Sequence, residues 1–308
     1  MPPLPQLPRL RHARDWQSLA YLVALPALAA WQWTHGFWWP LYALMLFLTL
    51  GVGVIHHNHT HRRLWRGRWA NRLTDSIITL LQGHPTFVFW PTHVANHHRH
   101  RHGEKDVART YRFRGGDTNH LSGYLLHPLQ AVCVLYPSIL AWLAALRQRS
   151  PGAFRYCLAQ YGLWLGVWAL LLAIDWRKAL LFVIVPQLHG LHWLLATNYL
   201  QHAHADGRAG ARGDTPGSAL NYARNFEGLV NPLLFNIGLH TAHHENPHVH
   251  WSELTRLHRA HYRACVAPAL NEGGLVPYML RVFVLGAVVP RFRSRALMPS
   301  MSADPSHH

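Results

Sequence analysis

Four long apolar segments set the pattern of this chain, and polar residues flank each of them. They cover residues 16–33, 37–55, 161–174 with its upstream flank, and 179–197. A helix needs about 20 predominantly apolar residues to cross the hydrocarbon core of a bilayer. The pattern therefore predicts an all-α integral membrane protein with about four transmembrane helices.

Short polar turns separate the two segments of each pair, at residues 34–36 and 175–178. Turns of this length return the chain to the side it left, so the four helices are expected to form two hairpins. A fifth apolar stretch, residues 123–146, is interrupted by Pro128 and Pro137. It predicts an interfacial or re-entrant helix, with a fifth span as the alternative.

Arginine residues predict the orientation of these helices, because positive residues stay on the cytoplasmic side of a membrane. They precede the first span and follow the second and fourth: Arg9, Arg11, Arg14, Arg62, Arg63, Arg66, Arg68, Arg72, Arg256, Arg259 and Arg263. Both termini and the polar regions are therefore expected in the cytoplasm, where they cap the hairpins as a helical domain. The proline-bearing ends predict a flexible segment at 1–15 and a tail at 291–308, around a membrane domain at 16–290.

Composition favours a membrane protein over a soluble domain. Half of the 308 residues are hydrophobic, only 14% are charged, and the net charge is +16. No nucleic-acid-binding motif accompanies this charge, and positive loops facing anionic lipid explain it. The first apolar run continues into a second one, which predicts a retained anchor and not a cleaved signal peptide. The three cysteines show no CxxC spacing and are expected to be reduced thiols.

Histidine is the candidate chemistry of this chain, which contains 27 of them. Eight fall into three clusters beside the apolar segments: His57 and His61; His93, His97 and His98; His240, His243 and His244. Side chains three or four residues apart share one face of a helix. Imidazole binds iron, zinc, copper or nickel, and a zinc site uses only three or four ligands. Eight imidazoles are enough for two metal ions with open coordination positions.

A ninth candidate ligand lies at the end of the fourth apolar segment. Asn198 and His202 are four residues apart where this segment leaves the membrane. An amide buried in an apolar run is costly without a partner. We expect His202 to bind the metal and Asn198 to contact a metal-bound water as a catalytic residue. A hydrogen bond from Asn198 to a neighbouring helix is the alternative.

The order of these elements resembles the membrane-bound fatty acid desaturase family, which includes related hydroxylases. An apolar hairpin, two histidine boxes, a second hairpin and a third box follow one another along residues 35–262. Residues 57–71 are similar to the family's first box with its downstream flank, and residues 238–247 are similar to its third. Asn58 stands where the family often has an acidic residue. The resemblance implies a di-iron centre that uses molecular oxygen and two electrons to attack an unactivated C–H bond.

The function implied by this resemblance is desaturation of a long-chain fatty acyl substrate carried by CoA, a carrier protein or a lipid. The nearest alternative is a hydroxylase or monooxygenase of the same fold that acts on alkyl, lipid or carotenoid chains. A histidine-rich metal transporter is a distant alternative, because the centres of the four spans lack the ionisable residues that such a path needs.

Electrons are expected from a separate donor, such as ferredoxin or a b-type cytochrome, because the chain has no dinucleotide, haem or iron–sulfur motif. This donor would dock on the basic cytoplasmic face. We expect a multi-pass protein of a bacterial inner membrane, with its active site on the cytoplasmic side and no nucleic-acid partner.

Further histidines and several carboxylates near the clusters each have two interpretations. The crowding histidines are His56, His59, His100, His102, His248 and His250, of which His59 could replace His57 as a ligand. The carboxylates are Asp75, Asp106, Asp206 and Glu245. Each carboxylate could orient a metal-binding imidazole or be a solvated surface charge.

Overall fold

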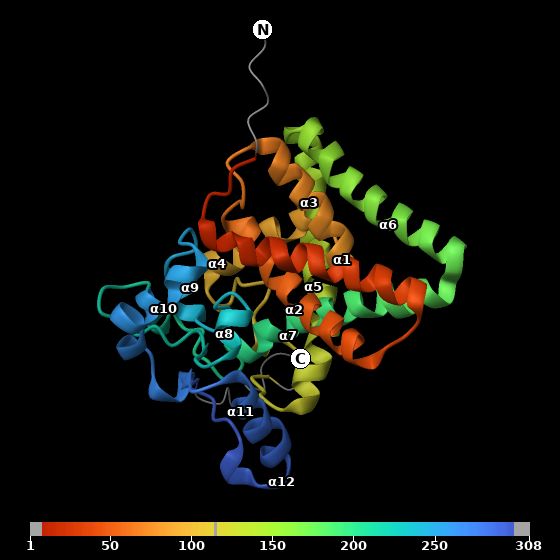
Figure 1. Ribbon diagram of the computed structural model, residues 1–308. Coiled ribbons are helices and arrows are strands. Elements are labelled where there is room, and N and C mark those ends of the chain that lie inside the picture. The colour runs from red at the N-terminus through yellow and green to blue at the C-terminus, as the bar shows by residue number, and fades with distance from the viewer. Residues whose placement is uncertain (1–7, 114–115, 299–308) are drawn as a thin grey trace, which may run out of the picture. The chain divides into compact units, whose positions relative to one another are not determined.

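The computed structural model describes residues 8–113 and 116–298, which are mostly helical (Figure 1). The chain divides into two compact units. Unit 1 contains Met1–Phe89 and Trp142–Leu194, and unit 2 contains Trp90–Ala141 and Leu195–His308. Each unit is thus built from two stretches that are distant in the sequence.

Unit 1 begins with two apolar helices that pack against each other, α1 (Trp16–His35) and α2 (Trp39–His61). Gly36 joins them at a φ of 95°, a backbone conformation that side chains other than glycine rarely adopt. Helix α3 (Arg68–Gln82) packs against α2, and the short helix η2 (Thr86–Val88) follows it. The first histidine cluster therefore lies on the last turns of α2.

The chain before α1 is structured from residue 9 onwards. The Arg11 N–H donates to the Leu64 carbonyl at 2.8 Å, and the Arg66 N–H donates to the Arg9 carbonyl at 2.9 Å. A short helix, η1 (Ala13–Asp15), then leads into α1. The second half of the predicted flexible segment 1–15 is thus tied to the loop after α2, whereas residues 1–7 lie outside the described residues.

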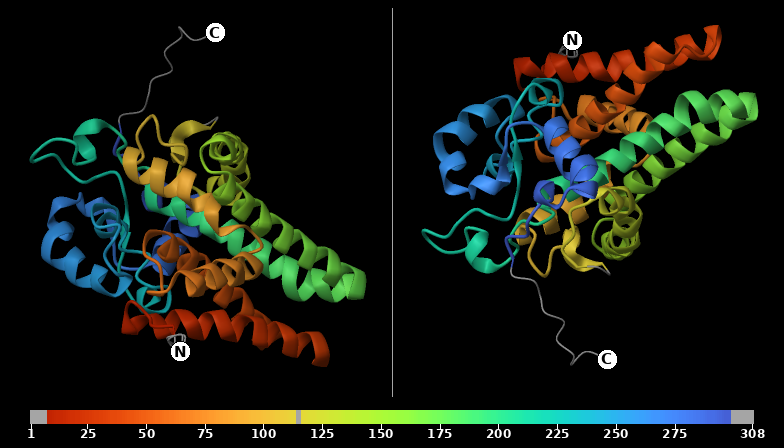
Figure 2. Two further views of the ribbon diagram at one scale, coloured as in Figure 1. Left: turned by 90° about the horizontal axis from the view of Figure 1, so that it is seen from above. Right: turned by 90° about the horizontal axis from the view of Figure 1, so that it is seen from below.

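A single helical stretch contains α6 (Pro151–Ala179), η5 (Leu180–Ile184) and α7 (Val185–His202). It is broken at Asp175, whose φ of −157° and ψ of 96° are extended. The Asp175 carboxylate accepts the backbone N–H groups of Arg177 and Lys178, both at 3.1 Å, and so caps the helix that follows. Figure 2 shows the chain turning back at this end, so that α6 lies beside η5.

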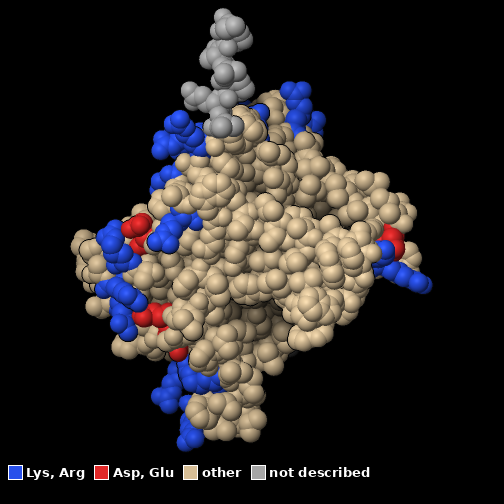
Figure 3. All heavy atoms as spheres, viewed as in Figure 1, with Lys and Arg blue, Asp and Glu red and all other residues tan. Residues whose placement is uncertain are grey.

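Three helical stretches of the described chain are long and apolar enough to cross a membrane: Trp39–His61, Leu121–Arg149 and Pro151–His202. The second predicted span lies in the first of them. The third and fourth predicted spans both lie in the last, on either side of Asp175. Helix α1 covers the first predicted span but is not among the three, because glutamine, serine and threonine dilute its apolar run. It nevertheless contains no Lys, Arg, Asp or Glu, and Figure 3 shows broad uncharged surface on this face of the molecule.

Residues 123–146 belong to one continuous helix, α5 (Leu121–Arg149), with Pro128 and Pro137 inside it. Each proline removes one backbone hydrogen bond, but the remaining bonds hold the helix because an apolar surrounding offers the backbone no competing partner. The sequence favoured an interfacial or re-entrant helix here. The alternative was a fifth span, and α5 has the length and hydropathy that a membrane span requires.

Unit 2 is assembled mainly from short elements around the end of α7. Its helices near the second and third histidine clusters are η3 (Trp90–His97), α4 (His98–His100), η4 (Thr110–Arg112), η6 (Ala209–Ala211), α8 (Val230–Leu233), α9 (His240–Glu245), η7 (Trp251–Glu253), α10 (Leu254–Leu257), η8 (His258–Tyr262) and η9 (Arg263–Cys265). Towards the C-terminus follow η10 (Pro268–Leu270), α11 (Leu275–Met279), η11 (Leu280–Leu285), α12 (Gly286–Val288) and η12 (Pro290–Phe292). Strands β1 (Asn225–Phe226) and β2 (Asn271–Glu272) pair in parallel.

The end of α7 is held in the core of unit 2. Tyr199 and Leu200 pack there with Phe226 and with Phe283 of η11. The fully buried guanidinium of Arg224 donates to the carbonyls of residues 200 and 203, both at 2.9 Å. These are terminal carbonyls that the helix itself leaves unsatisfied. Core packing and this cap together fix the helix end that carries His202, the candidate ligand of the fourth apolar segment.

Close packing between α2 and α7 in unit 1 depends on Gly190. A Cβ at this position would lie 3.0 Å from the Thr49 Cβ and 3.2 Å from the Thr49 carbonyl oxygen. We expect Gly190→Leu to force the helices apart and to destabilise the protein by about 1–3 kcal/mol. The melting temperature in detergent measures this effect. Gly166→Leu in α6 is the control, because nothing lies within 4 Å of its Cβ position. Equal melting temperatures for the two variants would contradict the close packing.

Candidate metal centre

Four buried histidines of unit 2 converge on one point, and we call them the four-histidine cluster. They are His97 of η3, His202 of α7, and His240 and His244 of α9. One ring nitrogen from each lies within 4.8 Å of the other three. The Nε2 atom of His240 lies 3.0 Å from the Nε2 atom of His202 and 3.0 Å from that of His244. Helical spacing places two of the four on one face of α9.

These nitrogen–nitrogen distances fit a metal ion with open coordination positions. A metal–imidazole bond is about 2.1 Å long, so two ligands at a right angle are about 3.0 Å apart and two tetrahedral ligands about 3.4 Å apart. The observed 3.0 Å is close to both distances and also to the length of a hydrogen bond between two imidazoles. A six-coordinate ion with four imidazoles has two positions left, which a closed tetrahedral zinc site does not have.

Protein acceptors orient two of the imidazoles through their outer nitrogens. The His97 Nδ1 lies 2.6 Å from the Asp106 carboxylate, and the His202 Nδ1 lies 2.7 Å from the Tyr222 carbonyl. A proton on Nδ1 leaves the lone pair of Nε2 for a metal. Among the described residues, the buried Nε2 of His97 has no hydrogen-bond partner. The donor set therefore fits a metal ion.

Asp106 is the carboxylate that supports this cluster. It accepts the hydrogen bond of His97 and the backbone N–H groups of His102 and Ala108, both at 2.8 Å. Burial alone raises the pKa of Asp106, but the interactions with His97 and with the Ala108 amide outweigh it and lower the pKa below its ordinary value. An ionised carboxylate behind an imidazole fixes the ring and strengthens it as a ligand.

The other three candidate carboxylates have different partners. Asp206 forms an ion pair with Arg208. Glu245 forms an ion pair with Arg101 at 2.9 Å and accepts the hydroxyl of Tyr222 at 2.8 Å. Asp75 belongs to unit 1 and contacts residues around the first histidine box.

A second group in unit 2 contains the remaining histidines of the second and third boxes, and we call it the three-histidine group. The His98 Nε2 lies 3.1 Å from the Nε2 of His93 and 3.1 Å from that of His243. The two groups are neighbours, because the rings of His98 and His244 stack with centroids 4.1 Å apart. Sequence neighbours in both boxes thus belong to different groups, and unit 2 presents two adjacent sets of nitrogens that could bind metal ions.

The first box supplies a pair of predicted ligands in unit 1. The rings of His57 and His61 lie 5.0 Å apart on the last turns of α2. This is the arrangement that their i, i+4 spacing predicts. Two imidazoles alone do not complete a metal site, so this pair needs further ligands.

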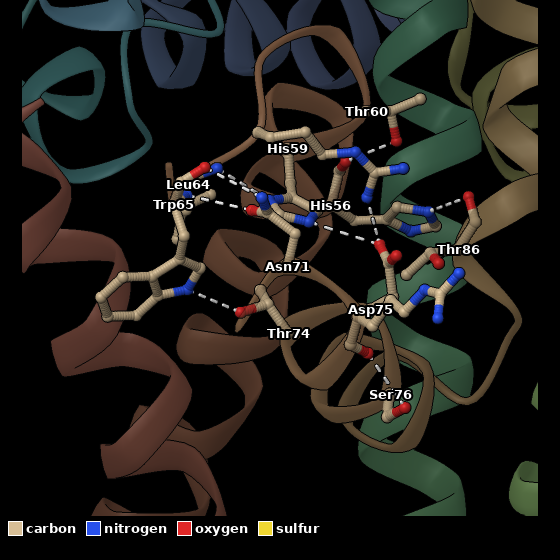
Figure 4. A network of polar contacts seen from close by, with 12 residues as sticks. His56, His59, Thr60, Leu64, Trp65, Asn71, Thr74, Asp75, Ser76 and Thr86 are labelled. Atoms are coloured by element: carbon tan, nitrogen blue, oxygen red, sulfur yellow. Dashed lines mark hydrogen bonds and ion pairs between the residues drawn. The ribbon is translucent and has the colours of Figure 1, made fainter. Parts of the chain in front are cut away.

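His59 and His56 have protein partners instead (Figure 4). The His59 Nδ1 accepts the Leu64 N–H at 3.2 Å, and its Nε2 lies 3.3 Å from the Asp75 carboxylate. The His56 Nε2 lies 3.0 Å from the Thr86 carbonyl. These contacts hold the loop after α2 in place. They favour His57 over His59 as the ligand, a choice that the sequence left open.

The model of the fatty acid desaturase family matches residues 31–272. This chain belongs to the fatty acid desaturase family. The matched region contains all three histidine boxes and the end of α7. Members of this family are typically enzymes. Searches of curated proteins and of solved structures found no match.

One buried histidine beside the desaturase boxes was not predicted as part of the centre. His102 is fully buried, and its ring stacks on that of His202 with centroids 5.1 Å apart. The backbone at Arg101 and His102 is left-handed, with φ values of 41° and 65°, and turns the chain back towards the cluster. A pattern of helical spacing carries no signal for such a turn. The other crowding histidines differ: His248 is exposed and His250 caps η7.

Asn198 makes a hydrogen bond that accounts for its position. Its amide N–H donates to the Ala108 carbonyl at 2.7 Å. Ala108 lies two residues after Asp106 in the chain. The amide therefore has a protein partner, but this partner lies in the turn before η4 and not in a neighbouring helix. A contact between Asn198 and a metal-bound water stays a prediction.

Removing the charge of Asp106 should weaken metal binding. We expect Asp106→Asn to lower the affinity of the four-histidine cluster about 10–100-fold, because the variant no longer presents an ionised carboxylate to His97. Competition with a chelator on metal-loaded protein measures the affinity. Asp214→Asn is the control, because that carboxylate is exposed and pairs with Arg212. Equal affinities in the two variants would show that Asp106 does not support the ligand.

Acid should destabilise the metal-free protein. Burial lowers the pKa of His102 to about 3 and, together with neighbouring imidazoles, lowers that of His244 well below its ordinary value. Below about pH 6.5 the unfolded chain binds protons that the folded chain excludes, so stability falls as pH decreases towards the folded pKa values. At about pH 5 one such imidazole costs about 2 kcal/mol. Melting curves across this range measure the slope. His102→Phe should flatten it, and an unchanged slope would contradict the assignment.

Proposed function

We propose that this chain is an oxygen-dependent desaturase that introduces a double bond into a long-chain fatty acyl substrate at a centre of two iron ions. The single observation that carries the proposal is the convergence of seven imidazoles of unit 2 into two adjacent groups. Membership of the desaturase family supports it. The number of imidazoles, larger than one zinc site uses, favours metal ions with open positions such as iron.

We assign one iron to the four-histidine cluster and the other to the three-histidine group, and we keep His57 and His61 as further proposed ligands. The three-histidine group alone leaves several coordination positions open, and the imidazoles of the first box are the remaining members of the predicted set of nine. Their i, i+4 spacing on α2 is suited to binding one ion.

Bound iron would supply the oxidising power that cleaves C–H bonds with oxygen. Overall, the acyl chain loses two hydrogen atoms, and oxygen takes these, two electrons and two protons to form two molecules of water. The protein's own residues orient the imidazoles and exclude water from them. Asp106 and the Tyr222 carbonyl hold His97 and His202, and all four imidazoles of the cluster are buried. The apolar helices provide an environment for the acyl chain.

The two electrons come, in this proposal, from a separate donor protein such as ferredoxin or a b-type cytochrome. The net charge of +16 supports docking of an acidic donor on a basic face. The arginines flanking the apolar segments support a cytoplasmic location for that face in a bacterial inner membrane.

Iron content and product mass test the proposal together. We expect about two irons per chain, falling sharply in His97→Ala and in His243→Ala, because each removes a ligand from a different group. Turnover with a long-chain acyl substrate, oxygen and a ferredoxin reducing system should give a product lighter by two hydrogens. A product that gains oxygen would instead identify a hydroxylase. Zinc alone, or iron unchanged in both variants, would defeat the di-iron assignment.

Two neighbouring histidines of the first box provide a matched comparison. We expect His57→Ala to reduce bound iron from about two to about one per chain. His59→Ala should keep the iron but lower the melting temperature, because its imidazole holds the Leu64 amide and contacts Asp75. Equal iron loss in both variants would contradict the separation of roles.

A further inference from the structure

We propose that the helix Leu275–Val288 lies in the plane of the membrane interface, with one side in lipid and the arginines after it at the level of the lipid phosphates. The partner of this surface is the bilayer itself. The proposal does not depend on the metal chemistry, because no histidine of either group lies on this helix.

This helix contains α11, η11 and α12 in succession (Figure 1). It is apolar but shorter than the three helical stretches that are long enough to cross a membrane. At a rise of 1.5 Å per residue it is about 20 Å long, whereas the hydrocarbon core of a bilayer is about 30 Å thick. The helix is therefore too short to span the membrane.

The two sides of the helix differ in burial but not in polarity. Tyr278, Val282 and Phe283 are buried in the core of unit 2. The other side repeats an apolar side chain every four residues, which places these side chains in one stripe. They are between 53% and 81% exposed: Val276, Leu280, Val284 and Val288. A side that faces water normally carries polar residues, so this stripe is suited to an apolar surrounding.

Contacts with the start of α5 indicate the depth of the helix relative to the membrane. The rings of Phe283 and of Tyr124, in the first turn of α5, have centroids 5.3 Å apart. The Asn119 amide N–H donates to the Tyr278 hydroxyl just before α5 begins. Helix α5 has the length and hydropathy of a membrane span, and such a span begins near the interface. The helix packed on its first turn therefore lies at the level of the interface.

Apolar surface on α5 adjoins this helix. Leu121 and Leu125 of α5 are nearly half exposed, and they line the same cavity as Gly286 and Ala287. Lipid that surrounds the start of α5 therefore reaches the helix as well. This continuity favours the bilayer over a protein partner as the occupant of the stripe.

Arginines accompany the helix without acidic residues. Between residues 273 and 298 the chain has no Asp or Glu and four arginines: Arg281, Arg291, Arg293 and Arg295. Arg281 pairs with Glu272 at 2.7 Å, and the three arginines after the helix are exposed. Arginines beside an apolar face are typical of interfacial helices, because they attract lipid phosphates. In a dimer formed through this side, the same arginines of two copies would repel each other.

Spin labelling of the full-length protein in lipid nanodiscs tests this placement. Single nitroxides at Leu280→Cys and Val284→Cys report collisions with oxygen, which dissolves in lipid, and with a water-soluble nickel complex. We expect both nitroxides about 5–10 Å below the lipid phosphates. Arg291→Cys should stay accessible to the nickel complex, because that residue lies at the level of the headgroups. All variants lack the native cysteines, which are replaced by alanine: Cys133, Cys157 and Cys265.

Two control positions in unit 2 calibrate the measurement. Leu129→Cys, on an exposed residue of α5, reports lipid, and Thr215→Cys, in an exposed loop, reports water. Melting temperatures equal to that of the cysteine-free protein show that the labelled variants are folded. Val276→Cys replaces a stripe variant that does not fold, because it lies on the same side of the helix.

Three results would overturn the proposal. Nickel accessibility at Leu280 and Val284 equal to that at Thr215 would place the stripe in water. Low accessibility to both reagents would show that protein, such as a second copy of this chain, covers it. A depth that increases from Leu280 to Val284 by the full rise of one turn, about 6 Å, would show that the helix enters the bilayer end-on.

Discussion

Burial of uncharged imidazoles is the constraint on which the centre depends. An imidazole that binds a metal must keep its inner lone pair free, and an acceptor at its outer nitrogen fixes that tautomer. Asp106 supplies that acceptor to His97, and the Tyr222 carbonyl supplies it to His202. The loop after α4, which carries Asp106, and the segment before β1, which carries Tyr222, must therefore hold these acceptors in place.

Arg224 shows how far this constraint extends. Its buried guanidinium caps the end of α7 through two carbonyls that lie on either side of His202 in the chain. Its own backbone N–H donates to the Gln201 carbonyl at 2.6 Å. A buried cation is costly unless its hydrogen bonds are satisfied. Here these bonds fix the helix end and, with it, the direction of the His202 imidazole, which could bind a metal ion.

Helical spacing explains how few elements supply two groups of ligands. On α9, His240 and His244 point to the four-histidine cluster, while His243 between them belongs to the three-histidine group. Likewise, His97 and His98 are adjacent in sequence but serve different groups. The HxxHH and HxxxHH patterns predicted ligands, and their division between two groups follows from the angle of about 100° between successive side chains.

The sequence by itself determined the helical membrane class, the family and the ligand candidates, because apolar length and i, i+3 and i+4 spacing are local properties. Tertiary structure alone decided which carboxylate contacts an imidazole of the four-histidine cluster, since Asp75, Asp106, Asp206 and Glu245 look alike until their partners are known. It also continued α5 through two prolines and buried His102 through a left-handed turn. Those outcomes depend on contacts between residues far apart in the chain, and no local pattern records such contacts.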